Sequence, residues 1–194
     1  MRNILLVGWP MLPIGAWAYH EGPGQDRLKL DECDTLMVAA NDAANKADFK
    51  GAVRGYESAL ASLPAGNTAL QQRLRLELNK ARMLASQLPD AREELECLVD
   101  ELATDKDADP QLVAEARQSL ARAQFYKTWL MRLEGLTREE WVPEIEAARQ
   151  NWRLLAEQAG TPAAKAQHQQ DLEAAIRLER MEVEDLQGLP LPSE

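Results

Sequence analysis

The residues that could carry chemistry are few and widely spaced along the chain. Its two histidines, His20 and His168, lie far apart, and neither has a nucleophile or metal ligand at a recognisable spacing. Metal binding and acid–base catalysis both need several such groups brought to one place. The surroundings of His168, "KAQHQQD", are typical of a solvated helix surface. We therefore expect neither histidine to be catalytic.

Carboxylates are numerous, but their pattern is that of helix surfaces. A general acid needs a pKa raised by burial. Here acidic residues alternate with arginines, as in Glu173 with Arg177 at i,i+4 spacing, which is typical of exposed ion pairs. The sequence has no glycine-rich phosphate loop and no G-x-S-x-G elbow. We expect no catalytic residue, no cofactor and no metal.

The two cysteines, Cys33 and Cys97, are not in a metal-binding spacing with each other or with a histidine. We expect both to be small buried apolar side chains. A disulfide between them is the alternative if the chain is exported, because oxidising compartments preserve such bonds.

Composition favours helices and argues against nucleic acid as a partner. Apolar residues make up 45% of the 194 residues, charged residues 28% and aromatic residues 5%. Alanine, leucine, glutamate and arginine dominate, and they lose little freedom in a helix. The formal net charge is −10 and the pI is about 4.8, so the surface would repel phosphates.

The first residues have the three-part layout of a secretory signal peptide. Arg2 precedes the uncharged run 4–18, which ends in Ala-Trp-Ala. We expect residues 1–18 to be a signal peptide, and the protein then to be periplasmic or attached to the bacterial envelope. An uncleaved anchor giving membrane association through residues 3–18, or an apolar leader on a cytoplasmic protein, are the alternatives. We further expect a linker at 19–31, a helical domain at 32–185 and a flexible tail at 186–194.

The stretch "NKADFKGAVRGYESALASLP", residues 45–64, lies at the centre of a pair of amphipathic helices. Leu36, Ala40 and Ala43 share one face of the first helix, at i, i+4, i+7 spacing. The second helix repeats the pattern from Phe49 to Leu63. Two helices this short cannot bury both apolar faces alone, so the pair must stack on further pairs.

This pair resembles the tetratricopeptide repeat. Ala52, Tyr56, Ala59 and the closing Pro64 occupy the small, aromatic, small and proline positions of the family's second helix, and we take them as the repeat-defining core. The resemblance is specific in residues 33–66 and degenerate to about residue 160. It implies an all-α fold: an α-solenoid of about seven helices in antiparallel pairs.

The later repeats match the family less well. A second unit has Leu88-Pro89-Asp90 as its turn, and a third has a long helix with Tyr126 and Leu130 in its apolar register. In that third unit, we expect the second helix to begin at Pro143. We expect residues 162–185 to form one C-terminal capping helix. Trp129, Trp141 and Trp152 all belong to the third unit, where they either pack in the core or form a partner-binding patch.

The resemblance also implies a concave groove lined by the first helix of each repeat. Asparagine amides one turn apart could bind a peptide backbone, and cations could receive a carboxylate. Met37 stands where chaperone-binding members of the family have a lysine, so a chaperone tail is not expected, and a solvated polar face is the plainer alternative. The expected groove residues are Met37, Asn41, Asn45, Arg73, Leu76 and Lys80.

We expect a protein–protein interaction adaptor or scaffold that binds a peptide or partner helix in this groove. The alternative is a structural subunit of a homo-oligomer whose groove is filled by its own C-terminal segment or by a second copy. Its identifying feature would be a strongly amphipathic C-terminal helix. Glu179 interrupts that helix's apolar stripe, which favours the adaptor.

Overall fold

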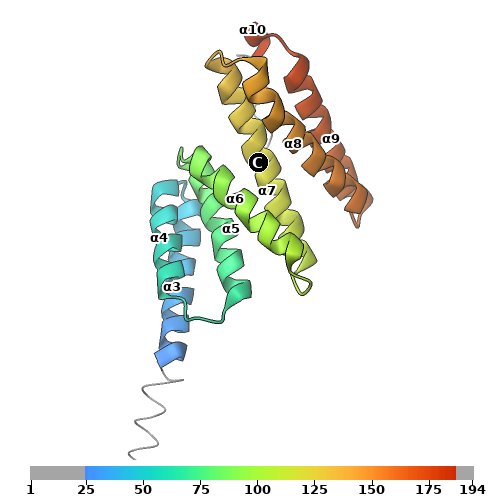
Figure 1. The fold of residues 1–194 in the computed structure, drawn as a ribbon. Helices are drawn as coiled ribbons and strands as arrows, with labels where there is room; N and C mark the ends of the chain where they lie inside the picture. Colours follow the sequence, from blue (N-terminus) through green and yellow to red (C-terminus); the bar gives the residue numbers. More distant parts are fainter. Residues whose placement is uncertain (1–24, 187–194) are drawn as a thin grey trace, which may run out of the picture. The chain divides into compact units, whose positions relative to one another are not determined.

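The structure, a computed structural model, describes residues 25–186, and over this range it is all-helical and contains no strand (Figure 1). The all-α prediction is therefore confirmed. The leader 1–18, residues 19–24 and residues 187–194 lie outside the described residues. The chain divides into two compact units whose boundary falls between Leu78 and Asn79, inside one helix.

The first unit contains the predicted helix pair. Helix α3 (Gln25–Asn45) packs against α4 (Phe49–Ser62) across a short turn. Ala47 in that turn has a positive φ of 59°, and the Asp48 carboxylate accepts a hydrogen bond of 2.9 Å from the Gly51 amide. The Asp48 side chain thereby caps the start of α4.

Small residues bring α3 and α4 into close contact. Ala40 is 1% exposed, and a Cβ added to Gly55 would lie 2.8 Å from the Ala40 Cβ. Ala52, Tyr56 and Ala59 are buried in the same unit. The Tyr56 hydroxyl donates a 2.6 Å hydrogen bond to Asn41 Oδ1, which joins the two helices at their polar edge.

The start of α3 corrects one prediction. The linker was expected to run to residue 31, but the helix begins at Gln25. The residues from Gln25 onward, "QDRLKLD", include good helix formers. Asp26 in the first turn also interacts favourably with the positive end of the helix dipole.

Helix α5 (Thr68–Leu84) contains the boundary between the two units. Leu74 and Leu76 are both 0% exposed. Residues two apart on a helix point about 200° away from each other. Helix α5 is therefore buried on opposite sides, unlike a surface helix with one apolar stripe.

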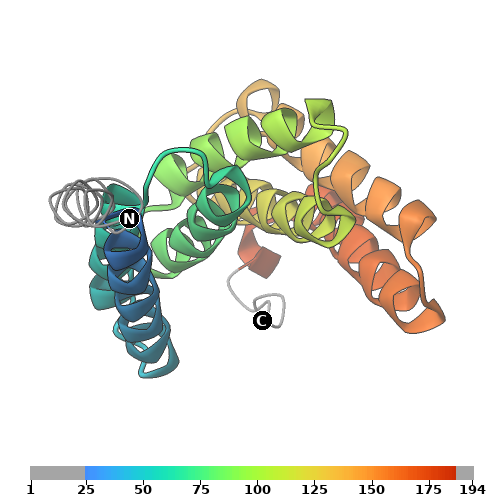
Figure 2. The same ribbon diagram turned by 90° about the horizontal axis from the view of Figure 1, so that it is seen from below.

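In the second unit, successive helices pack on one another. Helix α7 (Pro110–Leu133) contacts α6 (Leu88–Thr104) and α8 (Arg138–Gln158), and α9 (Pro162–Arg180) packs on α8. Figure 2 shows the same helices from below. The short α10 (Val183–Leu186) contacts α7. The core between these helices includes Phe125, Ile145, Trp152, Leu178 and Leu186.

Two prolines lie inside helices where we expected breaks. Pro89 stands in the first turn of α6, where its missing N–H costs little, and the turn is at 85–87 instead. Pro143 lies within α8, which starts at Arg138. The Glu140 carboxylate accepts a 2.8 Å hydrogen bond from the Thr137 amide, and this capping box holds the first turn ahead of Pro143.

The C-terminal helix is shorter than predicted. We expected one helix over 162–185 and a tail from 186, but α9 ends at Arg180 and α10 follows. Leu186 is 0% exposed, so it belongs to the core rather than to a tail. The Arg132 guanidinium explains the break, because it donates hydrogen bonds to the carbonyl oxygens of Leu178 and Met181 and so ends the helix there.

Candidate functional site

An apolar groove in the second unit is the strongest candidate site. Its volume is about 810 Å³. It lies along the last turns of α5, the start of α6 and the middle of α7. It is lined by Lys80, Met83, Leu84, Ser86, Leu88, Pro89, Ser119, Arg122, Tyr126, Trp129 and Leu130.

The groove exposes large apolar side chains on a rigid base. Leu84 is 44% exposed and Leu130 is 41% exposed. Tyr126 and Trp129 are partly buried, because they also pack against the core cluster of the second unit. Exposed apolar side chains gathered in a hollow, rather than scattered singly, are typical of a protein-binding surface. The base of this surface is held by the core, so little order would have to be gained on binding.

Local backbone geometry positions the α6 side of the groove. Ser86 has a φ of 65°, a conformation that turns the chain sharply between α5 and α6. Leu88 is buried and Pro89 is exposed directly after this turn. The turn therefore places the apolar ring of Pro89 at the groove, beside the exposed Leu84.

The charged residues that line the groove are basic, and each has an acidic neighbour. Lys80 Nζ lies 3.3 Å from Glu115 Oε2. Arg122 interacts electrostatically with Asp171 of α9. Because these cations already face carboxylates, a further carboxylate placed beside them would gain little, and the groove offers mainly apolar contact.

Asp171 of α9 has a partly buried carboxyl group. Its Oδ1 accepts a 3.4 Å hydrogen bond from Gln167 Nε2, and its buried Oδ2 has no partner among the described residues. Burial raises the pKa of Asp171, while the hydrogen bond from Gln167 and the charges of Arg122 and His168 offset part of this rise. Asp171 does not itself line the groove.

We expect Asp171→Asn to stabilise the protein at neutral pH. Because the folded-state pKa lies above the ordinary value of 3.8, the folded state binds more protons than the unfolded chain in that interval. Stability of the native sequence therefore falls as pH rises through this window, and the asparagine variant avoids the loss. Urea unfolding from about pH 3 to pH 7 should show the two proteins converging at the acid end.

Glu173→Gln is the matched control, because it removes one negative charge from an exposed position on the same helix. A stability gain for Asp171→Asn that stays constant down to pH 3, or equals that of the control, would contradict this account.

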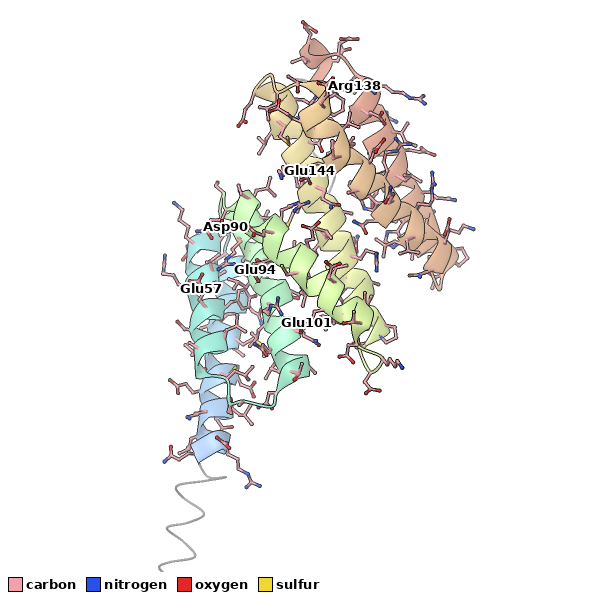
Figure 3. All side chains as sticks on the ribbon, viewed as in Figure 1. Glu57, Asp90, Glu94, Glu101, Arg138 and Glu144 are labelled. Carbon is pink, nitrogen blue, oxygen red and sulfur yellow. The ribbon has the colours of Figure 1, made fainter. Side chains whose placement is uncertain are left out.

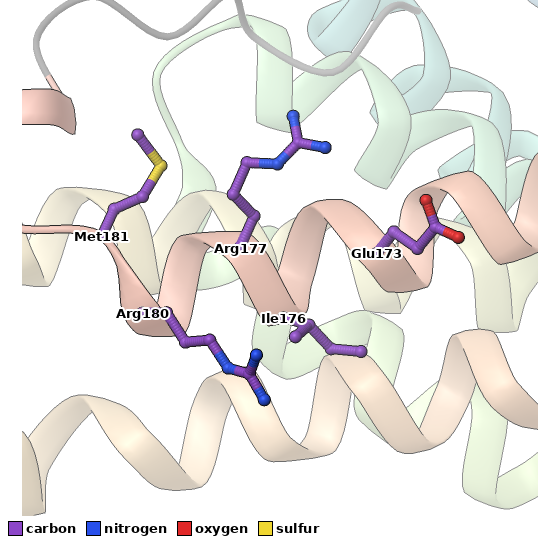
Figure 4. A pocket seen from close by; sticks show the side chains of 5 residues that line it. All are labelled: Glu173, Ile176, Arg177, Arg180 and Met181. Atoms are coloured by element: carbon purple, nitrogen blue, oxygen red, sulfur yellow. The ribbon is translucent and has the colours of Figure 1, made fainter.

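A second, smaller hollow of about 370 Å³ runs along α9. It is lined by Glu173, Ile176, Arg177, Arg180 and Met181, and Figure 4 shows these side chains spread along a single helix and its end. Its apolar lining consists of Ile176 and Met181, and charged side chains of both signs supply the rest. The hollow therefore offers less apolar contact than the groove.

The described residues hold no cluster of histidine, cysteine and carboxylate side chains suited to a metal ion. Asp90, Glu94 and Glu101 are exposed along α6, and Figure 3 shows them spaced along the helix rather than converging. Glu144 is more enclosed; its carboxylate lies 2.7 Å from Lys127 Nζ and 3.2 Å from Arg92 Nε. This is a structural ion-pair network that joins α6, α7 and α8. Within residues 25–186, no helix is long and apolar enough to cross a membrane.

The six predicted groove residues do not form the groove that the structure contains. Lys80 alone among them lines it. Asn41 and Asn45 are exposed at the end of α3, and Met37 is half-buried. Arg73 pairs with Glu77 at 3.8 Å. Leu76 is 0% exposed and offers no surface, because α5 is buried on opposite sides.

We expected both cysteines to be buried, and this holds for Cys33 only. Cys97 is exposed, and both are free thiols. Burial raises the pKa of the Cys33 thiol, with the hydrogen bond to Ser62 opposing. His168 is partly buried rather than fully solvated, and its Nδ1 has no partner among the described residues.

Two of the three tryptophans of the second unit are in its core. Trp141 and Trp152 are core residues, 6% and 1% exposed, while Trp129 lines the groove.

Sequence reasoning missed the apolar side of the groove. Leu130 was assigned to the apolar register of its helix, yet it is 41% exposed. The available signal was an excess of large apolar side chains on α7: Phe125 belongs to the core stripe, whereas Tyr126, Trp129 and Leu130 form a second stripe beside it. Met83-Leu84 just before the turn repeats this excess on α5.

In comparisons with known proteins, this chain matched no family model, no curated protein and no solved structure.

Proposed function

We propose that this protein is a non-catalytic protein–protein interaction scaffold, and that the groove on α5, α6 and α7 binds an apolar segment of its partner. The observation that carries the proposal is the exposure of Leu84 and Leu130 around the partly buried Trp129. Tryptophan and tyrosine in a pocket ringed by apolar contacts are typical of the residues that dominate binding energy.

We further propose that the helices are degenerate tetratricopeptide repeats, with α9 as the capping helix of a solenoid. Buried Ala52, Tyr56 and Ala59 support the first repeat. Successive packing of α6, α7, α8 and α9 supports the later ones. In this architecture α5 and α7 are both first helices of their repeats, and the groove lies on these two helices, as it would on the partner-binding face.

The leader sequence supports a location in the bacterial envelope. The run 4–18 has the signal-peptide layout described above, and the net charge of −10 favours solubility. Mass measurement of the protein produced with its full leader tests this part: a mature chain starting at Tyr19 is expected, and an intact soluble chain would contradict export.

Site-specific photo-crosslinking tests the binding function. A photoreactive amino acid at Leu130 should give one discrete adduct in the cells that make the protein. The matched control is Leu133 on the same helix, which is 37% exposed but does not line the groove. The adduct from Leu130 should fall when Leu84→Glu is introduced, because a carboxylate in the groove opposes apolar binding.

Equal adducts from Leu130 and Leu133, or an adduct that is insensitive to Leu84→Glu, would contradict the groove as the binding surface. If the crosslinked partner is an enzyme whose activity changes on binding, the result still fits a scaffold. Chemical turnover by the isolated chain would not.

A further inference from the structure

The groove is an apolar surface that the described residues leave uncovered. Leu84 and Leu130 each expose more than two fifths of their surface, at 44% and 41%. An uncovered patch of this kind favours association with whatever apolar segment is nearest. The segment that follows α10 is a candidate, because α10 contacts α7, which lines the groove.

Helix α10 places the start of that segment close to the groove. Leu186 is 0% exposed and belongs to the core cluster that includes Phe125 of α7. Tyr126 and Trp129 pack against the same cluster and also line the groove. Leu186 and the groove residues Tyr126 and Trp129 therefore belong to the same packed region, and α10 itself contacts α7, a helix that lines the groove.

The segment 187–194, "QGLPLPSE", has the composition that the groove selects. Leu189 and Leu191 are large and apolar, and two prolines alternate with them. Each proline fixes φ and favours an extended conformation, which lowers the entropy lost on docking. Glu194 supplies a carboxylate for the basic edge at Lys80 and Arg122.

The segment is also long enough. The groove follows α7 from Ser119 to Leu130, which is about 16 Å at 1.5 Å per residue. Eight residues in an extended conformation span about 25 Å. A tether this short holds the segment at an effective concentration near the millimolar range.

We infer that residues 187–194 dock in the groove of their own chain, with Leu189 and Leu191 against Leu84, Trp129 and Leu130. The regulatory consequence rests on the proposed function: a partner must displace this segment, so the scaffold is self-blocked until a competing apolar segment arrives. The apparent affinity for the partner is proportional to the fraction of molecules whose segment is undocked.

The test compares leucine methyl NMR spectra of the full chain and its variants. In the native sequence, the methyl signals of Leu189 and Leu191 should be shifted by the nearby indole of Trp129. Leu130→Glu should return them to values typical of an unfolded peptide, whereas Leu133→Glu should not. Unshifted methyl signals in the native chain, or equal effects of the two glutamate variants, would overturn the inference.

A dilution series separates this inference from docking in a second copy. The shifts should be independent of protein concentration when the segment docks in its own chain. Shifts that vanish on dilution would mean exchange between copies and would overturn self-docking.

The double variant Leu189→Ser and Leu191→Ser then links docking to regulation. It should raise the photo-adduct from Leu130 by about threefold, because more grooves are free. Leu28→Ser, at a 56% exposed leucine of α3 outside the groove and the segment, is the control and should leave the adduct unchanged. Docking seen by NMR with no adduct in any variant would reject the proposed function and leave self-docking standing. An adduct without docking shifts would do the reverse.

Discussion

Replacing Arg132 by methionine should lower the free energy of unfolding by about 3 kcal/mol. The Arg132 side chain donates hydrogen bonds to the carbonyl oxygens of Leu178 and Met181 at the end of α9. Hydrogen bonds from a charged donor contribute about 1.5–3 kcal/mol each, and the last carbonyls of a helix lack partners within the helix. Its guanidinium also stacks over the Trp141 ring at 4.8 Å.

Arg132 is 7% exposed, and burial lowers the pKa of its guanidinium. Methionine retains the long unbranched stem, so the loss should come from the missing donors rather than from a cavity. Urea denaturation monitored by circular dichroism measures the change. Hydrogen exchange at the amides of 183–186 should also accelerate, because Arg132 fixes the chain between α9 and α10.

Arg138→Met is the matched control for this prediction. Arg138 also approaches the Trp141 ring, at 5.5 Å, and pairs with Glu179 at 3.3 Å, but its side chain is 66% exposed. Exposed ion pairs contribute about 1 kcal/mol or less. A loss for Arg132→Met no larger than that for Arg138→Met would show that the carbonyl contacts contribute little.

The first helix pair could be predicted from sequence because local signals agree there. Apolar periodicity, the Asp48 cap and the residues around Tyr56 all indicate the same two helices. The end of α9 could not be predicted in this way. It depends on Arg132, which lies 46 residues before Leu178 in the chain, and no pattern within 162–186 reveals that contact.

The candidate site was harder to predict for a related reason. A helical register identifies a core stripe but cannot say how far burial extends to either side. The family resemblance assigns Leu76 to the groove-lining side of α5, yet Leu74 and Leu76 are both fully buried. The apolar register of α7 includes Leu130, yet its side chain is 41% exposed.

Substitutions of Trp152 and Trp129 should have different effects on stability and on partner binding. Trp152→Ala should cost about 3–5 kcal/mol of unfolding free energy, because removing a large buried side chain loses its transfer energy and leaves a cavity. Trp152 is 1% exposed and meets the Phe125 ring edge-on at 5.8 Å. Trp129→Ala should cost about 1 kcal/mol, since one side of that ring already faces the groove. Urea unfolding of the two variants measures both losses.

For partner binding, the substitution at Trp129 should have the larger effect. Trp129→Ala should reduce the Leu130 photo-adduct more than tenfold, because loss of an anchoring aromatic residue typically costs about 2 kcal/mol or more of binding energy. Trp152→Phe is the control variant: it keeps an aromatic ring in the core and removes an indole N–H that has no partner among the described residues. It should unfold close to the native protein and retain the adduct. If Trp129→Ala destabilised the fold as much as Trp152→Ala, Trp129 would be a core residue and the groove would lose its central contact.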